Sequence, residues 1–381
     1  MKKLRVVFLA SFFFAIHLAL VAYIHSSMLG EHVSANIVSV LFAIASALSI
    51  LLTLSAPRLM RSFGTVRVTL AVILFSALLL WVLGTATSEY VLLAAFVVYF
   101  ALNACILYAL DIFIEHYSAD AATGNIRGLM LTIMNVGWVG MPVLVGMIST
   151  RYGFNAVYLI SAIAISVCGI VIAISQRKFV ARPQSAPNLV AAFARIRKTP
   201  ALRRVISLNF LLQFFFSWMA LYVPLYLIQT LGFGWGTIGA IFSFMLIPFI
   251  LFPYPMGRIA DKWLGEKELM ITALTIMAVA VVALAVVSAP SAILVAGILF
   301  STRIGASTLE VMNDSYFFKQ VTDTDTEVIS FYRIMQPFAY VIGPMAGAGL
   351  LFFLSYTGLF VFLAGLLLLG ALYAFRIVDT R

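Results

Sequence analysis

Ionisable side chains within long apolar runs are the residues of this sequence best suited to chemistry. His17 lies about 18 Å beyond Arg5 and Arg303 about 20 Å beyond Pro290, at a helical rise of ~1.5 Å per residue. Histidine titrates near neutral pH, and arginine grips carboxylates or phosphates through paired hydrogen bonds. Because such groups are costly inside a membrane, we expect His17 to bind substrate or protons and Arg303 to hold an anionic group. A structural role, hydrogen-bonded within the protein, stays open for both.

Two pairs of acids lie one helical turn apart. Asp111 and Glu115 share one helix face, and Glu310 and Asp314 share another, because residues four apart are neighbours on a helix. Their depth places both pairs toward the same end of their apolar runs. We expect them to carry protons or to form ion pairs that hold a gate closed. The candidate partners are Arg127 and the Asp261–Lys262 loop for the first pair, and Arg61 or Arg333 for the second.

Amide and aromatic side chains supply the remaining candidates for substrate binding. Such groups suit a small polar or amphiphilic molecule, although aromatic residues are also ordinary packing in membrane helices. These candidates are Asn135, Asn209, Gln213, Trp218, Tyr222, Tyr226 and Gln336.

Other kinds of chemistry find no support in the sequence. The two cysteines, Cys105 and Cys168, lie in apolar runs, which indicates neither a disulfide framework nor a thiolate metal site. No Gly-x-x-x-x-Gly-Lys-Ser/Thr loop occurs, which excludes ATP-driven pumping within this chain. We therefore expect no catalytic residue, no metal and no cofactor. An integral membrane enzyme, which would need a His/Asp/Glu cluster at one interface, is the least favoured alternative.

Composition shows which elements must position these residues. The chain has 381 residues, of which 64% are apolar and 10% charged, against about 45–50% and about 25% in soluble domains. The apolar runs are too long and uniform for barrel strands, and helices satisfy their own backbone in hydrocarbon. We expect the first run to be retained as a helix and not cleaved as a signal peptide. Twelve membrane helices are predicted, at about 5–27, 34–57, 66–86, 89–116, 127–150, 154–176, 204–230, 235–257, 267–288, 290–318, 327–354 and 357–376.

The basic residues indicate how the chain is oriented. The net charge is +10, and most Lys and Arg lie at the two termini and on the connections that share their side. The positive-inside rule then places both termini in the cytoplasm of a cell whose inner or plasma membrane holds the protein, and it removes any need for a nucleic-acid partner. The basic segment Leu189–Lys198 is either part of a solvated linker or an amphipathic helix on the anionic inner leaflet.

The sequence repeats itself across that linker. Phe12–Phe14 recurs as Phe214–Phe216 and Leu29–Gly30 as Leu231–Gly232, both at an interval of 202 residues. Further pairs at 200 to 202 residues are Pro57-Arg58 with Gly257-Arg258, Gly64 with Gly265, Asp111 with Asn313, and Pro142 with Pro344. A parallel repeat of six helices is typical of transporters with a site between two bundles. The predicted domains are 1–176, a linker at 177–203, and 204–381.

One loop resembles a known family. Gly257-Arg-Ile-Ala-Asp261-Lys262-Trp-Leu-Gly265-Glu-Lys267 is similar to the Gly-x-Leu-Ala-Asp-Arg-x-x-Gly-Arg-Lys loop of the major facilitator superfamily, and the first-half copy has Arg61 where the acid is expected. Gly140-Met-Pro142 is similar to that family's Gly-Pro antiporter motif, with Met141 interrupting it, and packing is the alternative role of this segment. The resemblance implies an all-α membrane protein of two six-helix bundles related by pseudo-two-fold symmetry. It assigns gating to Gly257, Asp261, Lys262 and Gly265.

These observations predict a secondary active transporter that works as a monomer by alternating access. Its expected partners are a small organic solute, protons and the lipid bilayer. An organic anion held by Arg303 is one expected substrate. A hydrophobic, drug-like compound exported in exchange for protons is the alternative.

Overall fold

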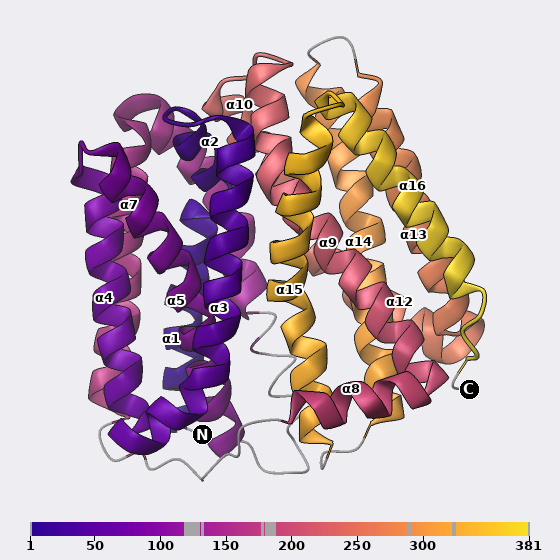
Figure 1. Ribbon diagram of the computed structural model, residues 1–381, viewed down its shortest axis with the longest axis horizontal. Helices are drawn as coiled ribbons and strands as arrows, with labels where there is room; N and C mark the ends of the chain where they lie inside the picture. The colour runs from indigo at the N-terminus through magenta and orange to yellow at the C-terminus, as the bar shows by residue number, and fades with distance from the viewer. Residues whose placement is uncertain are drawn as a thin grey trace. The chain divides into compact units, whose positions relative to one another are not determined.

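A computed structural model describes residues 2–117, 130, 133–176, 179, 188–287, 291–321 and 325–379, and these residues form helices without any strand (Figure 1). The elements of the first half are α1 (Lys2–Val21), α2 (His25–Gly30), α3 (Ala35–Phe63), α4 (Thr65–Thr85), α5 (Glu89–Tyr117) and α7 (Met141–Ser175). Those that follow are α8 (Leu189–Lys198), α9 (Pro200–Gln229), α10 (Trp235–Leu246), α11 (Pro248–Leu251), α12 (Pro253–Ile259), the π-helical turn η2 (Ala260–Leu264), α13 (Glu266–Ala285), α14 (Ala292–Gln320), α15 (Thr326–Leu351) and α16 (Tyr356–Ala374).

The helices are long and apolar enough to make a multi-pass membrane protein. The described residues contain 11 candidate spans, one of which, Ile133–Ser175, is 43 residues long. At ~1.5 Å per residue that run is about twice the thickness of a bilayer core, so it provides two crossings. They meet at Gly153, whose φ of 75° breaks the helical geometry, between the predicted fifth and sixth helices. The twelve predicted crossings are thereby accounted for.

The first compact unit consists of Met1–Ala186 together with Gly234–Ala240, the start of α10. Inside it α1 packs along α7, α7 also packs on α4, and α3 packs on α5. Glycines permit the closest approach: a Cβ on Gly84 of α4 would lie 3.0 Å from the carbonyl oxygen of Asn155 on α7. Small residues at such crossings are what holds helices together where lipid removes the hydrophobic driving force.

The second compact unit consists of Pro187–Phe233 and Ile241–Arg381. Its α13 packs on α14 and α16, and α9 packs on α14 and α15. The linker helix α8 also belongs here, since it packs on α9 and α15. Arg195 of α8 forms a two-pronged ion pair with Asp325, the residue before α15. The Asp325 carboxylate raises the pKa of Arg195 above its ordinary value through this hydrogen bond.

Two turns of the repeat share a backbone conformation. Gly64 ends α3 with φ 88° and Gly265 ends η2 with φ 85°, in the left-handed region that favours glycine. The helices that precede them extend beyond the predicted ends at 57 and 257. The chain stays helical until a glycine adopts a positive φ and turns the backbone. The predicted loop at 257–267 is therefore wrong in extent: helix continues through Leu264. Gly232 has φ 71°, whereas its repeat partner Gly30 lies in helix, so this pair is not equivalent.

Candidate functional site

The acids of α14 meet polar residues of α15. Glu310 and Asp314 are both partly buried, one turn apart on α14. The Tyr332 hydroxyl donates to Asp314 Oδ1 at 2.7 Å, and its ring stacks on Phe317 with centroids 4.0 Å apart. Arg333, on the same helix as Tyr332, lies close enough to Asp314 to interact electrostatically. The predicted pair is thus a carboxyl site in an apolar span, with a phenol and a guanidinium beside it.

Arg303 lies two helical turns before Glu310 on α14, beside two aromatic rings. Arg303 is only 3% exposed. Its guanidinium carbon lies 5.3 Å from the ring centroid of Phe215 and 5.9 Å from that of Phe216. Attraction to the ring faces offsets part of the cost of burying the charge. Both rings come from α9, so the arginine ties α14 to α9.

Trp218 and Tyr222, two of the residues predicted to bind substrate, join α9 to α15. The Trp218 indole donates to the Gly343 carbonyl at 2.7 Å, and the Tyr222 hydroxyl donates to the Pro344 carbonyl at 3.2 Å. Both side chains are fully buried. A Cβ on Gly343 would overlap Ser217, and one on Gly347 would overlap the Tyr222 phenol. These contacts form a packing seam between α9 and α15.

The predicted amides differ in environment. Gln213 Nε2 donates weakly to Asn209 Oδ1 at 3.5 Å, while its buried Oε1 has no hydrogen-bond partner in the described chain. Asn313, on α14, is fully buried and neither amide atom has a partner there. Sequence reasoning did not select Asn313, although the repeat pairs it with Asp111. Asn135 is partly buried and Gln336 exposed.

His17 lies in a polar network inside the first unit. Its Nδ1 is 2.6 Å from the Phe14 carbonyl oxygen, and its Nε2 is 3.1 Å from Asn103 Oδ1 of α5. Ser161 of α7 donates to the His17 carbonyl at 2.9 Å. A second buried histidine, His25, pairs with the Tyr158 hydroxyl at 2.9 Å. The sequence offered no depth argument for His25, since it falls near the end of its apolar run.

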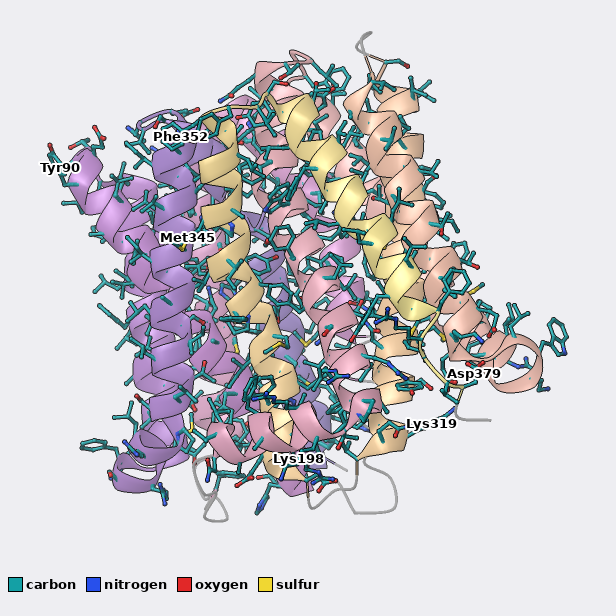
Figure 2. All side chains as sticks on the ribbon, turned by 45° about the vertical axis from the view of Figure 1, so that its right-hand side comes forward. Tyr90, Lys198, Lys319, Met345, Phe352 and Asp379 are labelled. Carbon is teal, nitrogen blue, oxygen red and sulfur yellow. The ribbon has the colours of Figure 1, made fainter. Side chains whose placement is uncertain are left out.

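The predicted gating loop is tied to the C-terminal segment. Asp379 Oδ1 accepts from the backbone N–H of Lys267 at 2.9 Å, and a Cβ on Gly265 would lie 2.7 Å from the Asp379 carboxyl. Figure 2 shows Asp379 and Lys319 at the same end of the second unit. There Lys319 pairs with the buried Glu266 at 2.6 Å.

For the other gating candidates the structure shows how exposed or how crowded the residue is, or it does not describe the side chain. Lys262 is exposed, and a Cβ on Gly257 would meet no heavy atom within 4 Å. Asp111 is half-buried on α5. Arg127 and the side chains of Glu115 and Asp261 lie outside the described residues. The described part of the chain contains no group of three His, Cys, Asp or Glu side chains able to hold a metal.

Comparison with known proteins places this architecture. A family model described as Major Facilitator Superfamily matches residues 7–252 and 206–381. Among solved structures, an auto-inhibited POT family peptide transporter covers 100% of this chain and 98% of its own, at 13% identity and a TM-score of 0.80. A POT family transporter in complex with a thioalcohol-conjugated peptide covers 97% and 95%, at 13% identity and a TM-score of 0.79. The POT family transporter PepTSo covers 98% and 97%, at 10% identity and a TM-score of 0.77. No curated protein matches the sequence.

Proposed function

From the premise that this chain belongs to the Major Facilitator Superfamily, whose members are secondary transporters and not enzymes, we propose that its transport of a small organic solute is driven by protons. The moving parts are residues 1–176 and 204–381, joined by 177–203. The protein acts as a monomer in the inner or plasma membrane, with both termini in the cytoplasm.

The acid pair Glu310 and Asp314 is the observation that carries the proposal. Two carboxyl groups one turn apart in an apolar span repel each other when both are ionised, and a proton on one removes the repulsion. Tyr332, at 2.7 Å from Asp314, holds that carboxylate in place. Both side chains keep part of their surface exposed. Glu310 is therefore the group that takes up and releases the coupled proton.

The substrate is an organic anion that reaches Arg303. An arginine at mid-span costs about 2.5–3.5 kcal/mol on insertion scales, which is retained where the guanidinium recognises a carboxylate or phosphate. The POT transporters named above are described as peptide transporters, and a peptide presents such a carboxylate. Export of a hydrophobic compound in exchange for protons is the competing function, favoured by the aromatic rings around Arg303.

Uptake into proteoliposomes tests both parts. The panel contains small anions, short peptides, sugars and cationic dyes, each measured with and without a pH gradient. We expect an anion or a peptide to accumulate only with the gradient. Accumulation of dyes alone would favour the competing function, and gradient-independent accumulation of every substrate would refute proton coupling.

Glu310→Gln separates coupling from movement. The amide cannot exchange a proton, so gradient-driven accumulation is lost while exchange of labelled for unlabelled substrate continues. Glu89→Gln, at an exposed position on α5, is the matched control and leaves both activities unchanged. Gradient-driven accumulation by Glu310→Gln at the wild-type rate would refute the role of Glu310.

A further inference from the structure

The His17 imidazole has one nitrogen committed and one nitrogen whose partner can change. The residue is fully buried. Its Nδ1 faces the Phe14 carbonyl at 2.6 Å, and because a carbonyl only accepts, Nδ1 must carry a hydrogen. Its Nε2 faces the amide of Asn103 at 3.1 Å. An amide can either accept through Oδ1 or donate through Nδ2, so this partner suits Nε2 in both of its forms.

The orientation of the amide therefore corresponds to the charge of the ring. With Oδ1 facing Nε2, as at the 3.1 Å contact, a hydrogen bond forms when Nε2 carries a proton, which is the charged form of the ring. With the amide rotated by half a turn, Nδ2 donates to a bare Nε2 and the ring is neutral. Either state leaves both ring nitrogens satisfied, which matters because an unpaired buried polar group is costly.

We propose that His17 Nε2 is a proton-binding site in the first unit and that rotation of the Asn103 amide accompanies its protonation. Protonation forms one N–H bond at Nε2 with a proton supplied by water, and deprotonation returns that proton to water. Asn103 is partly exposed whereas His17 is fully buried, so the proposed path of the proton to the imidazole runs past Asn103. The site supplies a second proton-binding group to the transport mechanism above and rests on that proposed function for its role.

The other groups that face the His17 imidazole carry no formal charge of their own in their neutral forms. On α5 the Tyr99 ring lies with its centroid 6.2 Å away, edge-on. On α7 Ser161 is occupied by the His17 carbonyl. His25 of α2 is near enough to interact electrostatically with His17, and the Tyr158 hydroxyl bonds His25. These facing groups are phenols, a hydroxyl and a second imidazole, and the Tyr99 hydroxyl also lies against the Asn103 side chain; among them Asn103 is the group that contacts Nε2.

Nuclear magnetic resonance of the full-length protein with ¹⁵N-labelled histidine tests the inference. The chain has 4 histidines, and His17→Gln identifies the His17 signals by their loss. We expect both ring nitrogens of His17 to show the protonated signature at the acidic end of a titration from about pH 3 to about pH 8, and Nε2 to lose it as the pH rises. A single unchanging form across that range would overturn the proposal.

Asn103→Asp provides the matched perturbation. A carboxylate can accept from Nε2 but cannot donate to it, so the doubly protonated signal persists at about pH 8, where the wild type has lost it. Asn36→Asp, which places the same new charge at the start of α3, leaves the His17 signals as in the wild type. An Asn103→Asp spectrum with wild-type pH dependence would also overturn the proposal. Since these signals do not depend on transport, failure of proton-driven uptake would refute the proposed function without changing this result.

Discussion

The seam between α9 and α15 makes a quantitative prediction through Trp218→Phe. Phenylalanine keeps an aromatic ring at the fully buried position but removes the indole N–H that donates to the Gly343 carbonyl at 2.7 Å. It also removes about three heavy atoms, which leaves a void against α15 because side chains around a buried site relax only in part.

The two losses can be added. A hydrogen bond between membrane helices is worth about 0.6 kcal/mol on average and at most about 1.7. The lost packing adds about 1–2 kcal/mol, below the ~3–5 kcal/mol of a full Trp-to-Ala truncation. The expected decrease in the free energy of unfolding is about 2–3 kcal/mol, or about 30- to 140-fold in the unfolding equilibrium at ~1.4 kcal/mol per factor of ten.

Reversible unfolding in lipid–detergent micelles, followed by steric trapping, measures this difference. Trp81→Phe is the matched control, because Trp81 is 54% exposed on α4 and its loss changes stability by less than ~0.5 kcal/mol. If Trp218→Phe were no more destabilising than Trp81→Phe, the seam would not hold α9 to α15 and the reasoning would be refuted.

Further predictions concern the ends of the second unit. Gly265→Ala lowers the free energy of unfolding by about 1–3 kcal/mol, because a φ of 85° suits glycine and a Cβ would lie 2.7 Å from the Asp379 carboxyl. Gly257→Ala is the control, since its Cβ would meet no heavy atom within 4 Å, and it leaves the thermal midpoint in detergent unchanged. Equal thermal midpoints for the two variants would contradict this prediction. Asp379→Asn weakens the acceptor at the start of α13 and costs about 0.5–1 kcal/mol; hydrogen exchange in that first turn rises, and wild-type exchange would count against the cap. Arg195→Lys loses the two-pronged bond to Asp325, so trypsin cleaves α8 faster than in the wild type. An unchanged rate of cleavage would contradict this prediction. Since Asp325 raises the Arg195 pKa, the contribution of this pair through the arginine charge is present below about pH 12 and lost only above it. The wild-type cleavage rate of α8, divided by that of an unstructured reference peptide, is therefore equal at pH 7 and pH 9.

Helix positions could be predicted from the sequence because hydrocarbon leaves the backbone few alternatives. The ends were less predictable: α3 and η2 continue to Phe63 and Leu264, since polar residues outside the apolar run remain helical until Gly64 or Gly265 permits a reversal. Hydrophobicity marks where lipid begins, whereas the backbone conformation of one residue decides where the helix stops.

Side-chain roles were harder to predict because they depend on partners far along the chain. Trp218 and Tyr222 have the composition of a binding site, but only three-dimensional structure shows their polar atoms directed at carbonyls of α15. His17 was identified by depth alone, while Asn103, 86 residues away, determines what its ring can do. Glu310 and Asp314 were predictable as a pair because a helix places residues four apart on one face.

The eighth membrane crossing differs mechanically from the second, its counterpart in the repeat. The second crossing is the single helix α3. The eighth consists of four short helical segments, α10, α11, α12 and η2, with prolines at 248, 253 and 255. Each proline lacks a backbone N–H and so removes one hydrogen bond that would otherwise stiffen this crossing. The boundary between the two compact units falls inside α10, after Ala240. Because its backbone hydrogen bonding is interrupted at several points, the eighth crossing bends at lower elastic cost than α3, which contains one proline, Pro57.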